Sequence, residues 1–527
     1  MILRKSGKPF RIFYCAILIC NMPSENTRRI AKNTAMLYIR MLLIMAVTLY
    51  TSRVVLNVLG VEDYGIYNVV GGIVVMFSFM NGAMAQATQR FFAYEIGRND
   101  FTQLHKVFCL SVTVHIGIAF FIFLLAETVG LWFLNTRMNI PVVRMEAARW
   151  IYQCSVFSFM VTVVQVPYNA MIIARERMHI YACIGIVEVV LKLLIVFVLK
   201  WVAFDKLKLY GVLVFIVTVL IALFYRIYCK YCFQECRYRF IWDKQLYEKL
   251  TGFAGWSMFG TLAWMCKSQG LNLILNIFFG PLLNAAYGIA NQVNTAVNSF
   301  VQNFTTALNP QIVKSYAAND RDYMEQLLFR GAKFSYYLLL LFALPLLMET
   351  EFILRLWLKM VPDYAVVFTR LVLVNSLLES FTYVMGTSIQ ATGKIRRYQL
   401  IIGGTILLNL PLAWLLLKLQ FLPSVILVVS IVISCITLVE RLLILQYLLG
   451  ISVWRFVIQV FWKAAAVTFI AGILPLFLKI SVPDGWGKFA GVVLCSLLCT
   501  LSAEFFIGFT SGERNYLLQI VRNRLKR

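Results

Sequence analysis

Residues 55–68, VLNVLGVEDYGIYN, and residues 274–291, ILNIFFGPLLNAAYGIAN, carry the same pattern and decide the fold. In both, an apolar run containing Asn leads to a Gly and then to a Tyr-Gly-Ile step that ends near a second Asn. Two further motifs recur at nearly the same offset. Asn99-Asp100 returns as Asn319-Asp320, and Ala174–Arg177 aligns with Ala391–Lys394. The chain is therefore built from two related halves, roughly 34–230 and 250–447.

The composition is that of a membrane protein. Of the 527 residues, 61% are hydrophobic and only 14% are charged, whereas a soluble protein is near half apolar and a quarter charged. This excludes an ordinary soluble enzyme. Apolar runs of about 20 residues predict transmembrane helices. Fourteen are expected, at 34–57, 65–89, 107–134, 147–172, 179–203, 209–228, 250–279, 284–311, 327–348, 364–391, 398–418, 423–447, 455–479 and 489–510.

Six helices in each half give both halves the same orientation in the membrane, which is a parallel repeat. The predicted fold class is an all-α polytopic membrane protein with two parallel-repeat six-helix bundles and two C-terminal helices. Lobes that rock against each other would provide alternating access. The expected parts are an N-terminal segment 1–33, a six-helix lobe 34–232, a loop 233–249, a second six-helix lobe 250–450, helices 13 and 14 in 451–510, and a basic tail 511–527. Residues 1–21 precede Met22, and both Met1 and Met22 stay open as the native start.

The net charge of +25 would suggest nucleic acid in a soluble chain. Here 33 of the 49 basic residues fall on one side of the predicted topology, 11 on the other and five within spans. Basic loops face the cytoplasm, so both termini are predicted to be cytoplasmic and no nucleic-acid partner is expected.

Motifs for catalysis, cofactors and metals are not found. Gly393-Lys394 and Gly487-Lys488 lack P-loop spacing, so no ATPase motif is present. Cys229, Cys232 and Cys236 form the only suggestive cysteine cluster, and a structural zinc site needs four ligands. We expect free thiols, no metal, no cofactor and no catalytic residues.

Ionisable side chains inside spans are the first candidate site residues, because each needs a partner or a hydrated cavity. Lys267 has no acidic residue on its own helix, so an anionic ligand or a carboxylate from another helix is expected beside it. Glu188 and Lys192 are spaced i,i+4, which fits either a structural ion pair or an ion-coupling site. Glu379 is the third ion-coupling candidate. The charged candidates for substrate binding are Arg40, Arg53, Lys267 and Arg370.

A polar stripe on the predicted eighth helix supplies the other candidates. Steps of three and four residues place its members on one helix face. Either they form hydrogen bonds between helices, or they line a hydrated path suited to sugar hydroxyls. The candidates for substrate binding are Asn291, Asn294, Asn298 and Gln302, and the stripe continues through Thr305 and Asn309.

The chain resembles the multidrug/oligosaccharidyl-lipid/polysaccharide (MOP) exporter superfamily, and most closely its polysaccharide-transporter branch, the Wzx-type O-antigen flippases. The resemblance rests on Asn33-Thr34 at the first helix, on Gly60-x-x-x-Tyr64-Gly65, and on the fourteen-helix count. It implies a multi-pass protein of the bacterial cytoplasmic (inner) membrane. Its substrate would be an oligosaccharide linked to undecaprenyl pyrophosphate, flipped to the outer leaflet. Membrane lipids and polysaccharide-assembly proteins would be its partners. A polymerase or glycosyltransferase, or a small-molecule exporter of the same superfamily, stays open as an alternative.

Overall fold

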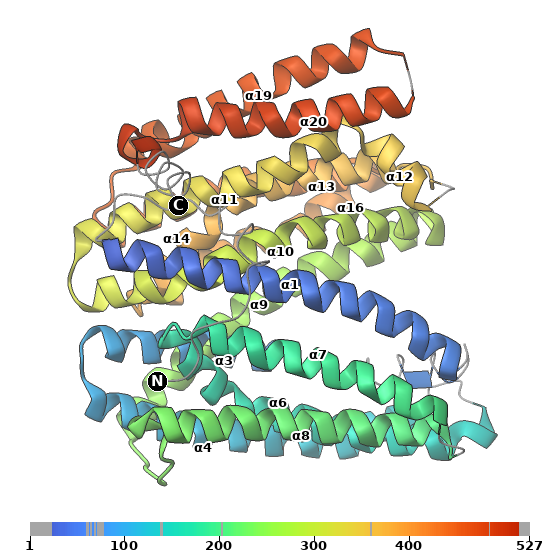
Figure 1. Cartoon of the computed structure of the whole chain (residues 1–527), viewed down its shortest axis with the longest axis vertical. Helices are drawn as coiled ribbons and strands as arrows, with labels where there is room; N and C mark the ends of the chain where they lie inside the picture. The colour runs from blue at the N-terminus through green and yellow to red at the C-terminus, as the bar shows by residue number, and fades with distance from the viewer. Residues whose placement is uncertain are drawn as a thin grey trace, which may run out of the picture. The chain divides into compact units, whose positions relative to one another are not determined.

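The computed structural model describes residues 24–59, 63, 66, 67, 70, 78–136, 141–201, 204–358, 361–483 and 485–515. Every secondary-structure element in these ranges is helical (Figure 1). The Tyr64-Gly65 turn, Asn68, and the choice between Met1 and Met22 lie outside the described residues.

The described chain divides into two compact units, one of residues 36–261 and one of residues 262–515 with the segment up to Ala35. The division falls inside helix α9. The first part of the chain contains α1 (Ser24–Leu59), α3 (Ser78–Gly97), α4 (Phe101–Leu125), η2 (Ala126–Gly130), α5 (Leu131–Thr136), η3 (Val142–Arg144), α6 (Met145–Ala174), α7 (Met178–Trp201), α8 (Lys206–Cys232), η4 (Gln234–Cys236) and α9 (Lys244–Phe279).

The second part continues with α10 (Pro281–Ala317), α11 (Arg321–Met348), α12 (Thr350–Leu358), α13 (Ala365–Ser380), α14 (Thr382–Ala391), α15 (Arg396–Leu407), α16 (Asn409–Lys418), α17 (Val425–Leu449), α18 (Val453–Phe456), η5 (Val457–Phe461), α19 (Trp462–Ser481), α20 (Trp486–Ala503) and η6 (Glu504–Gly508).

Eleven helical segments within the described residues are long and apolar enough to cross a membrane, by length and composition alone. The all-α polytopic fold class is confirmed. Three predicted spans are not among the eleven. Ten of the 25 residues of 65–89 lie outside the described residues, and 250–279 and 284–311 correspond to α9 and α10. Both helices are long, at 36 and 37 residues, but too rich in Asn, Gln and Gly to pass as apolar.

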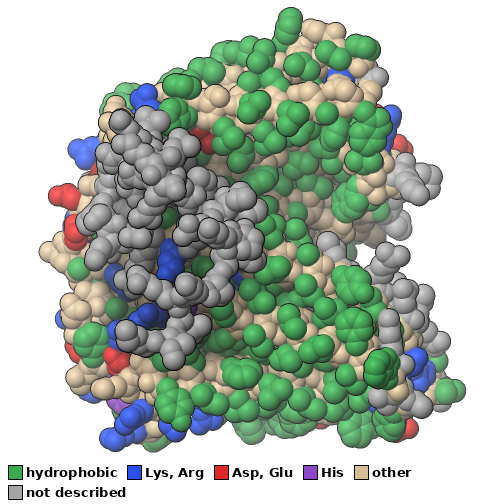
Figure 2. All heavy atoms as spheres, in the orientation of Figure 1, with side chains coloured by type: hydrophobic (Ala, Val, Ile, Leu, Met, Phe, Trp, Pro, Cys, Tyr) green, Lys and Arg blue, Asp and Glu red, His purple; other side chains and the backbone are tan. Residues whose placement is uncertain are grey.

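The surface has the composition expected of a protein in a bilayer. Figure 2 shows hydrophobic side chains over much of the visible surface, with far fewer charged side chains among them. Large apolar side chains are exposed along most of the helices, Trp201 and Phe469 among them. In water such a surface would be an aggregation hazard, whereas lipid tails solvate it.

Within unit 36–261, a core of small and aliphatic side chains holds α6 against its neighbours, with Tyr152 fully buried at its centre. The Tyr152 hydroxyl donates to the carbonyl of Ala126 at 2.7 Å, which satisfies its polar end. At one end of the unit, Arg144 donates to both Asp63 and Asp205, the latter at 3.1 Å. The hydrogen bond to Asp63 raises the pKa of Arg144, a residue that lies between two spans.

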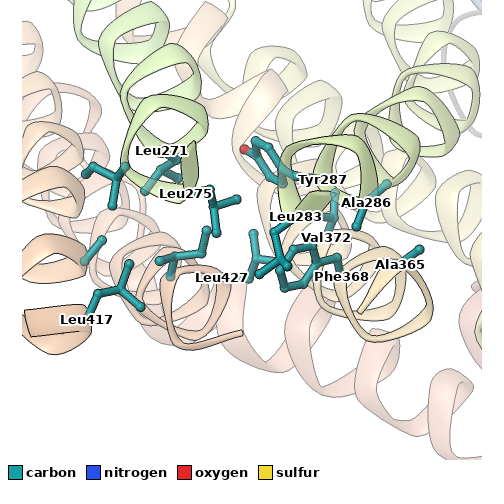
Figure 3. Packing of buried hydrophobic residues seen from close by; sticks show 14 of the residues in the cluster. Leu271, Leu275, Leu283, Ala286, Tyr287, Ala365, Phe368, Val372, Leu417 and Leu427 are labelled. Atoms are coloured by element: carbon teal, nitrogen blue, oxygen red, sulfur yellow. The ribbon is translucent and has the colours of Figure 1, made fainter. Parts of the chain in front are cut away.

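Within unit 262–515, a second core joins α9, α10, α13, α16 and α17. Figure 3 shows Leu271 and Leu275 of α9 on one side of this cluster and Leu283, Phe368 and Val372 close together on the other, with Tyr287 at its edge. Helices α19 and α20 pack against each other and against α11 (Figure 1). The core therefore fixes the spacing of α9, α10 and α13, the helices that carry the polar candidates.

The repeat motifs fold alike in the two halves. Asn99 and Asn319 both take a left-handed backbone, with φ of 57° and 60°. Asp100 and Asp320 then cap the next helix, each carboxylate accepting the backbone N–H three residues on. Glu176 and Gly393, aligned in the other motif, are also left-handed, at 59° and 76°. Corresponding turns in the two halves thus have the same conformation at the same positions.

Candidate functional site

A cavity of about 760 Å³ lies within unit 262–515, between α9, α10 and the α13–α14 segment. Its size is within the range usual for small-molecule sites. Seven side-chain amides line it, and Glu379 is the one charged side chain among its described lining residues. The lining residues are Trp264, Ser268, Gln269, Asn272, Asn284, Ala285, Tyr287, Gly288, Asn291, Asn294, Thr295, Asn298, Gln302, Glu379 and Tyr383.

Glu379 lies in the second half of one membrane span. Residues 365–391 form this span by length and composition, and Phe381, the single residue between α13 and α14, keeps right-handed helical dihedrals of −63° and −29°. The Thr382 hydroxyl donates to the carbonyl of Glu379 at 2.7 Å.

Lys267 and Glu379 form an ion pair, with Nζ donating to Oε1 at 3.3 Å. A carboxylate from another helix, one of the two partners expected from the sequence, thus lies beside Lys267. Asn375 Nδ2 also donates to Glu379 Oε1 at 3.0 Å, and the Ser434 hydroxyl donates to Asn375 at 2.7 Å. The lysine side chain is 12% exposed and the glutamate side chain 27%, so the carboxylate is the part that the cavity can reach.

The polar stripe on α10 divides between the two uses that its spacing allows. Ser376 and Asn298 both donate to Asn294 Oδ1, at 2.5 and 2.6 Å, and Tyr383 donates to Asn298 at 3.0 Å. These bonds join α10 to α13 and α14. Gln302 is exposed to the cavity and makes no side-chain hydrogen bond with described residues.

One lining residue of this cavity carries an unsatisfied atom. Asn284 Oδ1 is buried and accepts no hydrogen bond from the described residues. A buried acceptor without a donor is costly.

The other basic candidates are Arg370, which is not among the lining residues of this cavity, and Arg40 and Arg53 on α1. Arg370, on α13, donates to the Thr350 hydroxyl at 3.3 Å at the start of α12. Arg40, in unit 36–261, stacks over the Tyr181 ring at 4.1 Å and fills the space beside Gly185. Its Nε is buried and has no hydrogen-bond partner among the described residues. Arg53 belongs to α1, but its side chain lies outside the described residues.

Glu188 and Lys192 form the predicted i,i+4 pair on α7, with Nζ donating to Oε1 at 2.7 Å. Both side chains are about two-fifths exposed. The pair neutralises itself on one helix, and its use in ion coupling stays a prediction.

Sequence reasoning missed the α9 wall of the cavity. Trp264, Ser268 and Asn272 are spaced four residues apart, which places them on one helix face beside Lys267. This spacing could have predicted a polar face on the helix. The apolar residues between its members instead indicate an ordinary membrane span.

The cysteine cluster lies at the end of α8, with Cys229 and Cys232, and in η4, with Cys236. The thiol of Cys229 donates to the carbonyl of Tyr168 at 3.4 Å. A hydrogen bond with Cys229, together with burial, raises the pKa of Cys236, which lies outside the spans. No group of three or more potential metal ligands converges within the described residues.

Comparison with solved structures places this fold among transporters. An outward-facing multidrug resistance MATE family transporter of the MOP superfamily superposes with a TM-score of 0.70 at 12% identity, over 84% of this chain and 99% of that one. A MOP superfamily transporter from Pyrococcus furiosus, described as having a binding pocket of reversed polarity, gives 0.66 at 13%, over 85% and 100%. A MATE transporter in complex with Rb⁺ gives 0.66 at 12%, over 81% and 96%. At these identities the likeness concerns the fold.

Sequence comparison is more specific. No curated protein matches the chain. The MatE family profile matches residues 262–415, which include the whole cavity. The polysaccharide biosynthesis protein profile matches residues 30–316, more than half of the chain. The chain therefore belongs to the polysaccharide biosynthesis protein family, within the MOP superfamily of transporters.

Proposed function

We propose that this transporter is a flippase that moves an oligosaccharide linked to undecaprenyl pyrophosphate from the cytoplasmic to the outer leaflet of the bacterial inner membrane. The observation that carries the proposal is the amide lining of the 760 Å³ cavity. Side-chain amides both donate and accept, as sugar hydroxyls do. The polysaccharide branch of the superfamily, to which residues 30–316 match, supports the same substrate class.

The Lys267–Glu379 pair is the proposed coupling element. While Glu379 is ionised it holds Lys267, and the two charges cancel. Protonation of Glu379 would remove that partner and leave a lysine within reach of an anionic group. Phosphate oxygens accept strong charge-assisted hydrogen bonds from lysine. Pyrophosphate and carboxylate would then compete for Lys267, so that substrate binding and proton binding favour each other.

The decisive test is transport in liposomes. Full-length protein reconstituted with a defined undecaprenyl-pyrophosphate oligosaccharide is expected to move it across the bilayer, faster with a proton gradient. Two outcomes would refute the proposal. One is movement of the glycolipid that is equally fast in protein-free liposomes, and the other is no movement of the glycolipid with any gradient tested.

Deletion of the gene in its host separates the flippase from a polymerase. Loss of a flippase leaves complete repeat units on their carrier at the inner leaflet. Loss of a polymerase leaves single repeat units at the cell surface, and this outcome would contradict the flippase assignment. Protease access to tagged ends on whole cells tests the cytoplasmic placement of both termini.

A small-molecule exporter is the second candidate, because one feature of the cavity favours it. Glu379 is acidic and shares the lining with the rings of Trp264 and Tyr383, a combination that attracts organic cations. Accumulation assays with a lipophilic cation discriminate the two. Energy-dependent efflux that Glu379→Gln abolishes would favour the exporter, provided that the glycolipid is not transported.

A further inference from the structure

A second cavity, of about 570 Å³, lies in the same unit between α11, the α18–η5–α19 segment and the residues after η6. Four cations and three carboxylates line it, and we call it the basic cavity. The cations are Arg330, Lys333, Arg455 and Lys463, and the carboxylates are Asp322, Glu325 and Glu513. None of them was a candidate from the sequence. All four cations are on the side of the membrane that the charge distribution predicts to be cytoplasmic.

At the inner end of the basic cavity, the Glu513 carboxylate is the shared partner of two cations, Lys333 and Arg330. Lys333 Nζ donates to Glu513 at 2.9 Å, and Arg330 Nε lies 3.8 Å from the other oxygen of the same carboxylate. Lys463 is near enough to act electrostatically on Lys333. At the opening, Arg455 pairs with Glu325 at 3.0 Å. Positive charge is therefore in excess at the inner end.

Two donor groups at this end have no use within the described chain. Lys463 makes no ion pair or hydrogen bond with described residues, and Arg330 Nη1 is buried without a hydrogen-bond partner. A buried charged donor without an acceptor costs free energy. The arrangement suits an anion with several acceptor oxygens, and a phosphate group has them.

The lipid-facing side of the α18–η5–α19 segment indicates that the basic cavity opens at the membrane surface. Trp454, Ile458 and Trp462 recur every four residues and are 70%, 46% and 62% exposed. Each precedes a residue that lines the basic cavity, namely Arg455, Gln459 and Lys463. Tryptophan is enriched where lipid tails meet head groups. The π-helix Val457–Phe461 has more residues per turn than an α-helix, so residues four apart stay on the same side of this segment.

We propose that the basic cavity binds the phosphate of an acidic phospholipid head group, with Lys463 Nζ and Arg330 Nη1 as its donors. Basic pockets between helices on the cytoplasmic side suit such head groups, since that leaflet is anionic. A free phosphate ion has the same donor needs, but the exposed tryptophans favour an occupant with acyl chains. The site lies outside the amide cavity and does not depend on the transported substrate.

Native mass spectrometry of the purified full-length protein, titrated with phosphatidylglycerol, tests the proposal. Wild type should bind one molecule tightly. Lys463→Gln should bind it about tenfold more weakly, as expected for one lost charge-assisted hydrogen bond. Lys463→Arg should keep the affinity. Lys394→Gln, which removes an exposed lysine on the same predicted side, is the matched control and should bind as wild type does. Arg330→Lys keeps the charge but removes Nη1, and should also weaken binding.

Three results would overturn the proposal. Equal affinity of wild type and Lys463→Gln for phosphatidylglycerol would show that Lys463 is not a donor to the bound lipid. Equal binding of phosphatidylcholine would show that the phosphate of an acidic lipid is not recognised. If inorganic phosphate alone raises the melting temperature as much as phosphatidylglycerol does, the occupant is a free anion and not a lipid.

Discussion

Lys267 and Lys333 each pair with a carboxylate from another part of the same unit, yet their surroundings differ. Lys267 meets Glu379 at 3.3 Å, and that carboxylate lines a cavity and is 27% exposed. Lys333 meets Glu513 at 2.9 Å, and both side chains are at most 5% exposed. Glu513 also accepts from the backbone N–H of Thr510, and Lys333 also donates to the carbonyl of Gly508.

The difference separates an accessible carboxylate from a buried one. Water reaches Glu379, so this carboxylate can be protonated, or displaced by a ligand, at modest cost. Glu513 also lines a cavity, but it is almost wholly buried and is bonded to the backbone as well as to Lys333, so this pair loses its geometry when either charge goes. Substitutions at the two pairs should therefore affect different measurements, transport at one and unfolding at the other.

The largest expected effect is on stability, at Glu513. Glu513→Ala leaves Lys333 buried without a carboxylate and removes the bond to Thr510, so the free energy of unfolding should fall by about 3–5 kcal/mol. Unfolding of the purified protein in detergent measures it. A change below that of a surface substitution would contradict the structural role of this pair.

The second effect is on transport, at Glu379. Glu379→Gln keeps the hydrogen bond with Asn375 but removes the charge and the proton site, so gradient-driven transport should fall at least tenfold, equivalent to about 1.4 kcal/mol. Lys267→Ala should do the same. The Lys267→Ala protein should fold at wild-type levels, since water in the cavity can solvate the remaining Glu379 carboxylate. If either variant transports normally and is only less stable, the role of the Lys267–Glu379 pair is structural, like that of Lys333–Glu513.

A smaller effect is expected from the cavity amides. Gln302→Leu and Asn291→Leu should each weaken oligosaccharide binding about fivefold, because one hydrogen bond contributes about 1 kcal/mol. Asn303→Leu is the matched control, since Asn303 is not among the lining residues and donates to the carbonyl of Ser299 on its own helix. Equal losses at Asn303 and Gln302 would mean that the effect comes from the helix and not from the cavity.

The smallest effect on stability is expected at Glu325. Its partner Arg455 is 59% exposed, so Glu325→Gln should change the free energy of unfolding by less than about 1 kcal/mol. Freeing Arg455 should at the same time strengthen the binding of phosphatidylglycerol. Weaker lipid binding would indicate that Glu325 positions Arg455 instead of competing with the lipid.

The two pairs also differ in how far the sequence could predict them. Lys267 lacks an acidic residue on its helix, and this alone predicts an external partner. Glu379 was a candidate for another reason, and only the packing of α9 against the α13 side of the unit reveals that the two belong together. The Lys333–Glu513 pair was missed because Glu513 lies after the last span, where a carboxylate looks solvated.

For the fold, hydrophobic runs were enough to predict most spans. A segment in lipid has to satisfy its backbone hydrogen bonds internally, and an apolar run of this length does so as a helix. On α10, the spacing predicted a polar face, but the division between Asn294 and Gln302 depends on which neighbour supplies a hydroxyl.

The paired turns at Asn99-Asp100 and Asn319-Asp320 have a consequence for biogenesis. Each turn is closed by its own residues, through a left-handed Asn and a capping Asp. Neither needs support from distant parts of the chain. The hairpins α3–α4 and α10–α11 can therefore form as soon as both of their helices have left the ribosome, and each can enter the bilayer as a finished unit before the rest of its lobe is made.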